Sequence, residues 1–285
     1  MKLRIVSSAL VAAALLFLSS CFGIPSFHFG GGIRGSGDIQ TESRSTEAFS
    51  GVENQTSGTV EIVQGSRRLV EVELDDNLLP HLVTRVEDDV LKIFFDRSVS
   101  GADLTVRIVV PTLSRAILSG SGEVTIDRAV EAESLVLVNA GSGSLEAEAI
   151  EAAALEVVAS GSGDVEIESA TLQLFKVSAT GSGSVTVGGV RAESGQSTLV
   201  GSGSLRISGG SSDTWVHSGV GSGTLYGEEL RVRVAQIDLA GSGSAYMAVT
   251  EALAAETAGS GSIYYGGNPD ARVAEPGSGR VLQVD

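Results

Sequence analysis

The tripeptide Gly-Ser-Gly recurs along the second half of this chain with an almost constant spacing that few folds can accommodate. Successive copies are 18 to 21 residues apart and begin at residues 120, 141, 161, 181, 201, 221, 241, 259 and 277. A fixed period of about 20 residues is typical of a solenoid, in which each repeat is one coil that buries its apolar side by stacking on its neighbours. The spacing therefore predicts an architecture, but by itself it does not indicate a catalytic or binding activity.

Apolar and polar residues alternate on both sides of the tripeptide. Around the copy at residue 161, the apolar positions are Leu155 and Val157 before it and Val165 and Ile167 after it. A period of two is the pattern of a β-strand with one face turned inward. A further small or apolar residue nine or ten positions after the first glycine, such as Ala170, predicts a corner. Each coil is thus expected to hold two short strands joined by turns.

Coils of this kind stack into long parallel sheets with a spacing of about 4.8 Å between strands. The predicted fold is therefore all-β, a single-chain parallel β-helix with coils of about 20 residues. Crossovers between parallel strands are right-handed in about 98% of cases, so we expect a right-handed helix. The regular coils are assigned to residues 120–285.

We expect the tripeptide to be a structural corner. Glycine permits positive φ and close backbone approach, and a serine hydroxyl can bond to the serine one coil away, which predicts a hydroxyl ladder from Ser121 to Ser260. A phosphate-binding loop would need a helix after the glycines, and a calcium-binding roll would need the pattern G-G-x-G-x-D; neither is found here. The predicted corner residues are Gly120, Ser121, Gly122, Gly141, Gly143, Gly161, Gly163, Gly181, Gly183, Gly201, Gly203, Gly221, Gly223, Gly241 and Gly243.

The N-terminus has the features of an export signal. Lys2 and Arg4 precede an apolar run that ends in Leu18-Ser19-Ser20-Cys21, which indicates a secretory signal peptide over residues 1–20. This ending resembles the lipobox of bacterial lipoproteins, and the resemblance implies that Cys21 becomes the lipidated first residue of the mature chain. The alternative is an ordinary signal peptide followed by a free thiol. Cys21 is the only cysteine, so an internal disulfide is excluded.

Export and lipidation together predict attachment to the cell envelope. Residue 22 is Phe rather than Asp, and resemblance to the Gram-negative sorting rule implies the outer membrane. Residues 21–37, which include three consecutive glycines, are predicted to be a flexible tether. Whether the protein faces the periplasm or the outside is left open.

Residues 38–119 have a less regular spacing than the repeats that follow. Strands are expected at 60–63, 69–74, 82–86, 91–95 and 104–110, with turns at 75–77 and 87–89. We interpret this region as early coils with longer loops that also cap the first edge of the β-helix, because an open edge invites strand addition. From Tyr264 onward the chain is expected to form a final short coil.

Several segments resemble the putative auto-transporter adhesin, head GIN domain family. They are Glu47 to Val52, Gly58 to Gly65, Val70 to Val72, Asp89 to Ile93, Val109 to Pro111 and Ser119 to Gly122. The resemblance covers about residues 46–265. It implies a secreted or lipid-anchored bacterial β-helix with an adhesin-like role, and it brings no catalytic residues.

The charge of the chain excludes some partners. There are 35 acidic against 19 basic residues, a formal net charge of −16, and loss of the signal peptide makes the chain more acidic still. Nucleic acid is not expected as a partner of such a surface. The acidity is expected to keep a repetitive β surface soluble, while cation binding by the acidic loops is the functional alternative.

The three histidines give no sign of a metal site. His28, His81 and His217 are isolated in the sequence, and none has the spacing to a cysteine or a second histidine that zinc sites show. No metal or cofactor is therefore predicted.

His217 is nevertheless unusual, because it occupies an inward position where an equivalent coil has Val157, and Trp215 stands two residues earlier. The simpler interpretation is a hydrogen-bonded histidine inside the core. The alternative is a small binding pocket built from Trp215 and His217, with Tyr226 and Tyr246 in adjacent coils.

A polysaccharide-cleaving β-helix would need carboxylates that converge on one groove. Glu146 and Glu166 occupy equivalent positions in adjacent coils and are expected about 5 Å apart, but the other acidic residues scatter. We therefore predict a non-enzymatic, lipid-anchored envelope protein whose polar face meets a glycan or an envelope protein. The alternatives are an envelope spacer with no external ligand and a polysaccharide-active enzyme. The sequence does not predict the oligomeric state.

Overall fold

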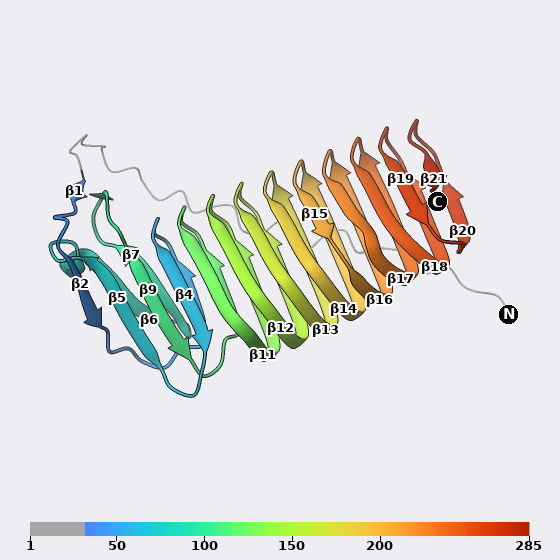
Figure 1. Ribbon diagram of the computed structural model, residues 1–285. Helices are drawn as coiled ribbons and strands as arrows, with labels where there is room; N and C mark the ends of the chain where they lie inside the picture. Colours follow the sequence, from blue (N-terminus) through green and yellow to red (C-terminus); the bar gives the residue numbers. More distant parts are fainter. Residues whose placement is uncertain (1–31, 285) are drawn as a thin grey trace. The chain divides into compact units, whose positions relative to one another are not determined.

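In the computed structural model, which describes residues 32–284, the chain winds into a row of stacked parallel coils (Figure 1). Each long strand pairs in parallel with the next at the same register, as where Leu145 pairs with Val165 and Val165 with Val185. The predicted parallel β-helix is confirmed. The strands of its regular coils are β10 (Arg115–Leu118), β11 (Glu123–Asn139), β12 (Ser144–Ala159), β13 (Asp164–Gly181), β14 (Ser184–Gly201), β15 (Ser204–Ile207), β16 (Gly210–Gly221), β17 (Thr224–Gly241) and β18 (Ser244–Thr257).

Each coil has three faces rather than the two that the sequence predicted. In β13 inward and outward residues alternate regularly except at two points, residues 168–169 and 173–174, where two successive residues are exposed. The strand bends at these points, which separates a first face (164–168), a second face (169–173) and a third face (174–180). The second face turns only two residues inward, Ala170 and Leu172, so it is too short to show a period of two in the sequence.

The core is a set of columns that run along the whole solenoid. The column that contains Val165 consists of aliphatic side chains that are at most 1% exposed from the first coil to Ile263. Burial of each valine or leucine contributes about 1.5–3 kcal/mol, so the stability of a coil depends on the coils on either side. The members are Val106, Val60, Val124, Leu145, Val165, Val185, Leu205, Leu225, Ala245 and Ile263.

The Gly-Ser-Gly corner requires glycine because successive coils approach closely there. A Cβ atom on Gly143 would lie 1.7 Å from the carbonyl oxygen of Gly122 in the preceding coil. The coils are joined at this corner by main-chain bonds, as where the N–H of Ser222 donates to the carbonyl of Gly201 at 2.8 Å.

The predicted hydroxyl ladder is wrong for most of the rod. Among the central serines of the tripeptides, Ser260 and Ser278 alone share a side-chain hydrogen bond, at 3.2 Å. The central serines are exposed from Ser121 to Ser278. Because their hydroxyls face water and the main chain already joins the coils, the ladder has no advantage over solvation.

The first two coils are stacked out of chain order. The second coil, β3 (Gly51–Asn54) and β4 (Thr59–Gln64), lies between β10 and β11 on one side and β7 (Val90–Phe95) and β9 (Thr105–Val110) on the other. Residues 90–110 therefore form the outermost coil, although they follow the second coil in the sequence. The sequence did not predict this order of the early coils.

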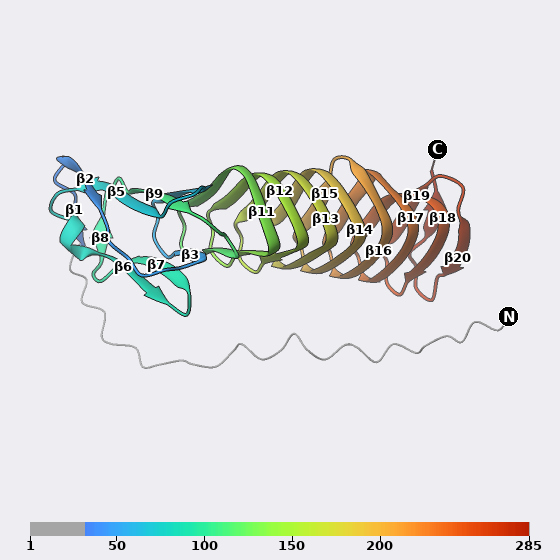
Figure 2. The ribbon, with the colours of Figure 1, turned by 90° about the horizontal axis from the view of Figure 1, so that it is seen from below.

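Antiparallel strands close this end. β5 (Leu69–Asp75) pairs with β9, β2 (Ile39–Ser43) pairs with β5, and β6 (Leu82–Glu87) pairs with β7, all antiparallel. Figure 2 shows β2, β5 and β6 gathered at one end of the row of coils. Asp88 and Asp89, both at positive φ, form the two-residue turn between β6 and β7, and a short 3₁₀ helix, η1 (Leu79–His81), precedes β6.

The predicted signal peptide, Cys21 and most of the predicted tether lie outside the described residues. Residues 32–37 are a correction, because they belong to the folded body rather than to a tether. β1 (Ile33–Arg34) pairs with β8 (Val99–Ser100), and the N–H of Gly37 donates to Asp75 at 2.7 Å. Within residues 32–284, no helix is long and apolar enough to cross a membrane.

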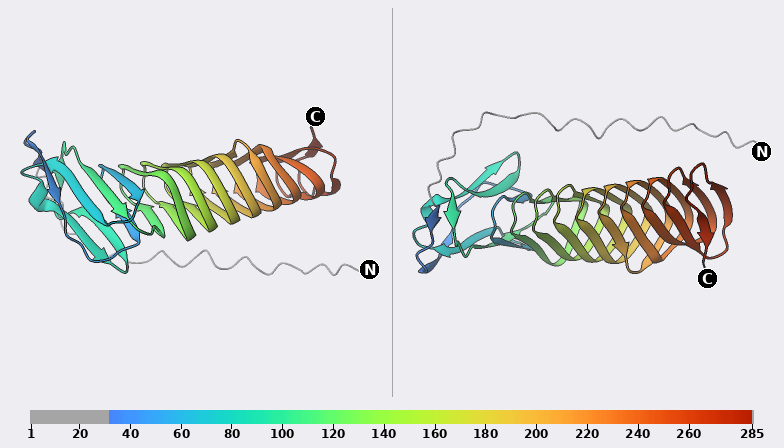
Figure 3. Two further views of the ribbon diagram at one scale, coloured as in Figure 1. Left: turned by 60° about the horizontal axis from the view of Figure 1, so that its bottom comes forward. Right: turned by 90° about the horizontal axis from the view of Figure 1, so that it is seen from above.

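The opposite end is the final short coil that the sequence predicted. It consists of β19 (Ser262–Gly266), β20 (Asp270–Ala274) and β21 (Val281–Gln283). β19 and β20 stack on β18, and β21 stacks on β19. In the right-hand view of Figure 3, these red strands form the end of the row.

Candidate functional site

A shallow groove with a volume of about 400 Å³ runs along the second face from β13 to β18. Leu172, Ala192 and Ser212 form its floor, because they are the inward residues of the second face in three successive coils. The residues on either side of each floor residue point outward and form two walls. The groove is thus a direct product of the bends that create a short second face.

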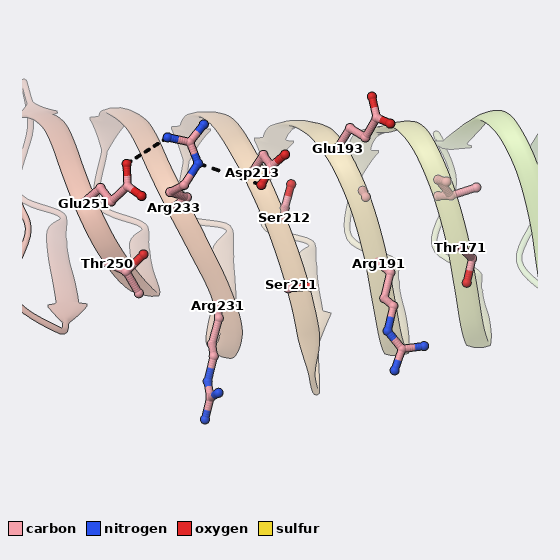
Figure 4. Close-up of a pocket in the computed structure, with 12 residues that line it drawn as sticks. Thr171, Arg191, Glu193, Ser211, Ser212, Asp213, Arg231, Arg233, Thr250 and Glu251 are labelled. Atoms are coloured by element: carbon pink, nitrogen blue, oxygen red, sulfur yellow. Dashed lines mark hydrogen bonds and ion pairs between the residues drawn. The ribbon is translucent and has the colours of Figure 1, made fainter.

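One wall of the groove is a chain of ion pairs. Arg233 Nη1 lies 2.8 Å from Glu251 Oε2, and Arg233 Nε lies 3.8 Å from Asp213 Oδ1 (Figure 4). The hydrogen bond to Glu251, followed by its negative charge, raises the pKa of Arg233. Both pairs are exposed, so they orient the side chains more than they stabilise the fold.

The other wall carries two arginines without such partners. Arg191 and Arg231 occupy equivalent positions two coils apart, with Ser211 between them, and this register separates them by about 9.6 Å along the rod. Figure 4 shows both side chains extending toward the same side, away from Arg233. In the part of the chain that the structure describes, neither forms an ion pair. A guanidinium group presents a planar set of donors that suits carboxylate, sulfate or phosphate.

A second hollow, of about 270 Å³, lies on the first face among acidic residues. Glu146 and Glu166 are register partners in it, as the sequence predicted. Glu148 accepts a hydrogen bond from the main-chain N–H of Arg128 at 2.8 Å. Across residues 32–284, no group of three or more His, Cys, Asp or Glu side chains is placed to hold a metal ion. The arrangement is an acidic outward column on a sheet.

Trp215 and His217 lie inside the rod, each 1% exposed. Trp215 donates its indole N–H to the hydroxyl of Ser197 at 3.0 Å, and this hydroxyl lies 2.9 Å from Nδ1 of His217. Because the indole can only donate, the serine oxygen accepts from it, and the serine hydroxyl and Nδ1 share the second hydrogen bond. Burial lowers the pKa of His217 from 6.5 to about 4, so the ring is neutral at pH 7.

Trp215 and His217 therefore belong to a buried polar cluster, which agrees with the simpler interpretation of a hydrogen-bonded histidine inside the core and not with the alternative of a binding pocket. The structure brings Trp215 together with Phe175, at 6.1 Å between ring centroids, and with Ser197, whereas Tyr226 lies on the outside of the sheet. The signal for this arrangement was Gly195, directly beside Trp215 in the preceding coil. A Cβ atom on Gly195 would lie 2.1 Å from the indole, so the missing side chain makes room for the large ring.

The tyrosines form a separate outward ladder on the first face. Tyr226 and Tyr246 stack at 5.7 Å, Tyr246 and Tyr264 at 4.7 Å, and the guanidinium of Arg206 lies 4.1 Å from the ring centre of Tyr226. The rings pack face to face along the rod, so they cover one another. This ladder stabilises successive coils from the outside.

Comparison with known proteins agrees with the fold. Residues 48–207 and 169–269 match the family described as putative auto-transporter adhesin, head GIN domain. A search of curated proteins finds no match.

Solved structures of bacterial proteins share the architecture. A putative adhesin from Parabacteroides distasonis is 23% identical, with a TM-score of 0.71 over 88% of this chain and 99% of its own. A putative adhesin from Parabacteroides merdae is 19% identical, with a TM-score of 0.69 over 89% and 99%. A putative lipid binding protein from Parabacteroides distasonis is 23% identical, with a TM-score of 0.66 over 89% and 99%. At these identities the likeness shows the fold alone.

Proposed function

Because the chain belongs to the putative auto-transporter adhesin, head GIN domain family, we propose that it is a lipid-anchored, non-catalytic protein of the bacterial envelope that binds a surface partner through its second-face groove. The partner is an acidic glycan. The anchor is Cys21 at the end of the lipobox-like segment, and the membrane is the outer membrane, in keeping with Phe22.

The observation that carries this proposal is the pair Arg191 and Arg231. In a chain with a net charge of −16, two guanidinium groups project from the same wall without an acidic partner in the described residues. Their separation of about two strand spacings lets one extended polymer contact both. An acidic glycan supplies repeated carboxylate or sulfate groups along such a line.

The rod also supports an interaction role through its rigidity. Every coil is joined to the next along three faces and at the Gly-Ser-Gly corner, so the groove is held by main-chain ladders rather than by loops. A preorganised surface loses little conformational entropy when it binds an extended ligand. The groove therefore suits an elongated partner better than a small molecule.

The glycan component is tested with a polyuronate, a sulfated polysaccharide and a neutral polysaccharide as probes. We expect the full chain to bind the two acidic polymers, and Arg191→Gln with Arg231→Gln to weaken binding at least tenfold. Arg97→Gln with Arg115→Gln is the matched control, because it removes the same charge from two exposed arginines outside the groove, and it should change binding by less than threefold. Equal binding of the neutral polymer, or no effect of the double substitution, would contradict the proposal.

The anchor and its orientation are tested in cells. Labelling with a fatty-acid analogue should mark the wild-type protein and leave Cys21→Ser unmarked. Protease added to intact cells should cleave a rod that faces outward. Complete protection in cells whose surface proteins are digested would instead support the periplasmic spacer.

A further inference from the structure

The last coil leaves its inward residues uncovered. Val273 belongs to the same column as Ile237 and Ala255, but it is 47% exposed whereas Ile237 is fully buried. Val281, the register partner of the fully buried Ile263, is half-buried. The inward face of the last coil is therefore partly exposed to solvent at this end of the rod, which we call the tip.

The tip also has free strand edges. Among the described residues, β20 pairs only with β18, and β21 pairs only with β19. The outer edge of each strand therefore presents main-chain N–H and C=O groups to which another strand can add. Exposed apolar residues next to such an edge are the usual composition of a strand-pairing interface.

The sequence of β20 is complementary to itself. Asp270 and Arg272 flank Ala271 and point outward, and neither forms an ion pair within the described residues. If two copies of β20 lie antiparallel about a two-fold axis through Ala271, Asp270 of each copy faces Arg272 of the other. Opposite charges directly across antiparallel strands are favourable, and the two-fold axis produces the pair twice.

Electrostatics favours the tip over the sides of the rod. The whole chain carries a net charge of −16, so contact side by side brings acidic columns together. In residues 262–285 the charges nearly balance, with Asp270, Glu275 and Asp285 against Arg272 and Arg280. The tip is therefore a region where two copies meet with little net repulsion.

We propose that two copies of this chain associate tip to tip through antiparallel pairing of β20, which covers Val273. The contact is isologous and closes on itself, so it yields a dimer rather than a fibre. Head-to-tail addition is disfavoured, because the antiparallel strands cover the inward residues of the first coil. This interaction uses the tip alone and does not depend on the second-face groove.

The test is sedimentation velocity of the full chain carrying Cys21→Ser, which removes the predicted lipid. The parent should show a monomer–dimer equilibrium. Asp270→Arg and Arg272→Asp should each weaken the dimer about tenfold or more, because each creates two like-charge pairs. The double variant D270R/R272D should restore the dimer, and so should an equimolar mixture of the two single variants.

Arg97→Asp is the matched control, because it reverses an exposed charge at the opposite end and should leave the equilibrium unchanged. Thermal unfolding of each variant checks that the fold is intact. The proposal is overturned if the parent stays monomeric at its highest soluble concentration, or if the two single variants fail to associate with each other.

Discussion

The coil nearest the N-terminus is covered by strands that run against it, whereas the last coil is left open. The inward residues Leu91 and Val106 of the first coil are fully buried, beneath a cap that includes Val72 and Leu74 of β5. At the other end Val273, also an inward residue, is about half exposed. A further coil can always be added to a stack of parallel strands, so the end of the stack is covered only by strands that run in the opposite direction. Residues 38–119, which lack the Gly-Ser-Gly tripeptide, provide these strands at the N-terminal end.

The largest expected effect is a difference between two leucines, one at each end. Leu74→Ala removes a fully buried side chain from the cap and should lower the free energy of unfolding by about 2–5 kcal/mol. Leu282→Ala at the open tip should change it by less than about 0.5 kcal/mol, because the side chain is already exposed. Denaturant unfolding at low protein concentration measures both. Equal losses would show that the two ends are closed to the same degree.

A smaller difference is expected at the glycine corners. Gly143→Ala places a Cβ atom 1.7 Å from the carbonyl of Gly122, and coils on both sides prevent relaxation, so we expect a loss of about 3 kcal/mol. Gly279→Ala meets the carbonyl of Gly261 at 1.8 Å, but the last coil has no further coil above it and can shift. Its loss should be clearly smaller in the same unfolding experiment. A larger loss at Gly279 would mean that the tip is held as firmly as the middle.

The middle of the rod should show a pH dependence that neither end affects. The pKa of His217 is about 4 in the folded state and near 6.5 when unfolded, so the unfolded chain binds this proton first as the pH falls. The stability from the neutral ring is complete above pH 6.5 and is lost on the way to pH 4, with about 2 kcal/mol gone by pH 5.

Two variants isolate this contribution. His217→Leu should remove this part of the pH dependence, although the hydroxyl of Ser197 then loses its hydrogen bond to the imidazole, so the variant gains little stability at pH 7. Leu282→Ala should keep the full dependence. An unchanged slope between pH 7 and pH 5 in His217→Leu would contradict the assignment.

The regular coils could be predicted from the sequence because a single physical requirement repeats in them. Val165, Val185 and Leu205 must each fill the same column, and glycine must return wherever two backbones approach within the reach of a Cβ atom. The cap could be predicted only in part. Its strands have clear periods of two, but nothing in a period states that residues 90–110 stack beneath residues 51–64 or that β5 runs antiparallel to β9.

The candidate sites were harder to predict, for two different reasons. The sequence placed Trp215 and His217 at inward positions, but it left a binding pocket open as the alternative because Gly195 and Ser197, the residues of the preceding coil that give them space and a hydrogen bond, were not considered with them. Arg191 and Arg231 stand on the outward side of the second face, where packing imposes no residue type. Their relation becomes visible only once the bends define that face and the register places them two coils apart.

The out-of-order stacking of the first coils has a consequence for how the chain folds. The coil of β3 and β4 has both of its neighbours later in the sequence, so it cannot be completed until residues up to 127 are in place. Contacts between such widely separated segments form slowly, so we expect this coil to limit the rate of folding. Each later coil needs only about the next twenty residues and a neighbour that is already folded, so we expect the coils to form in order from the cap to the tip.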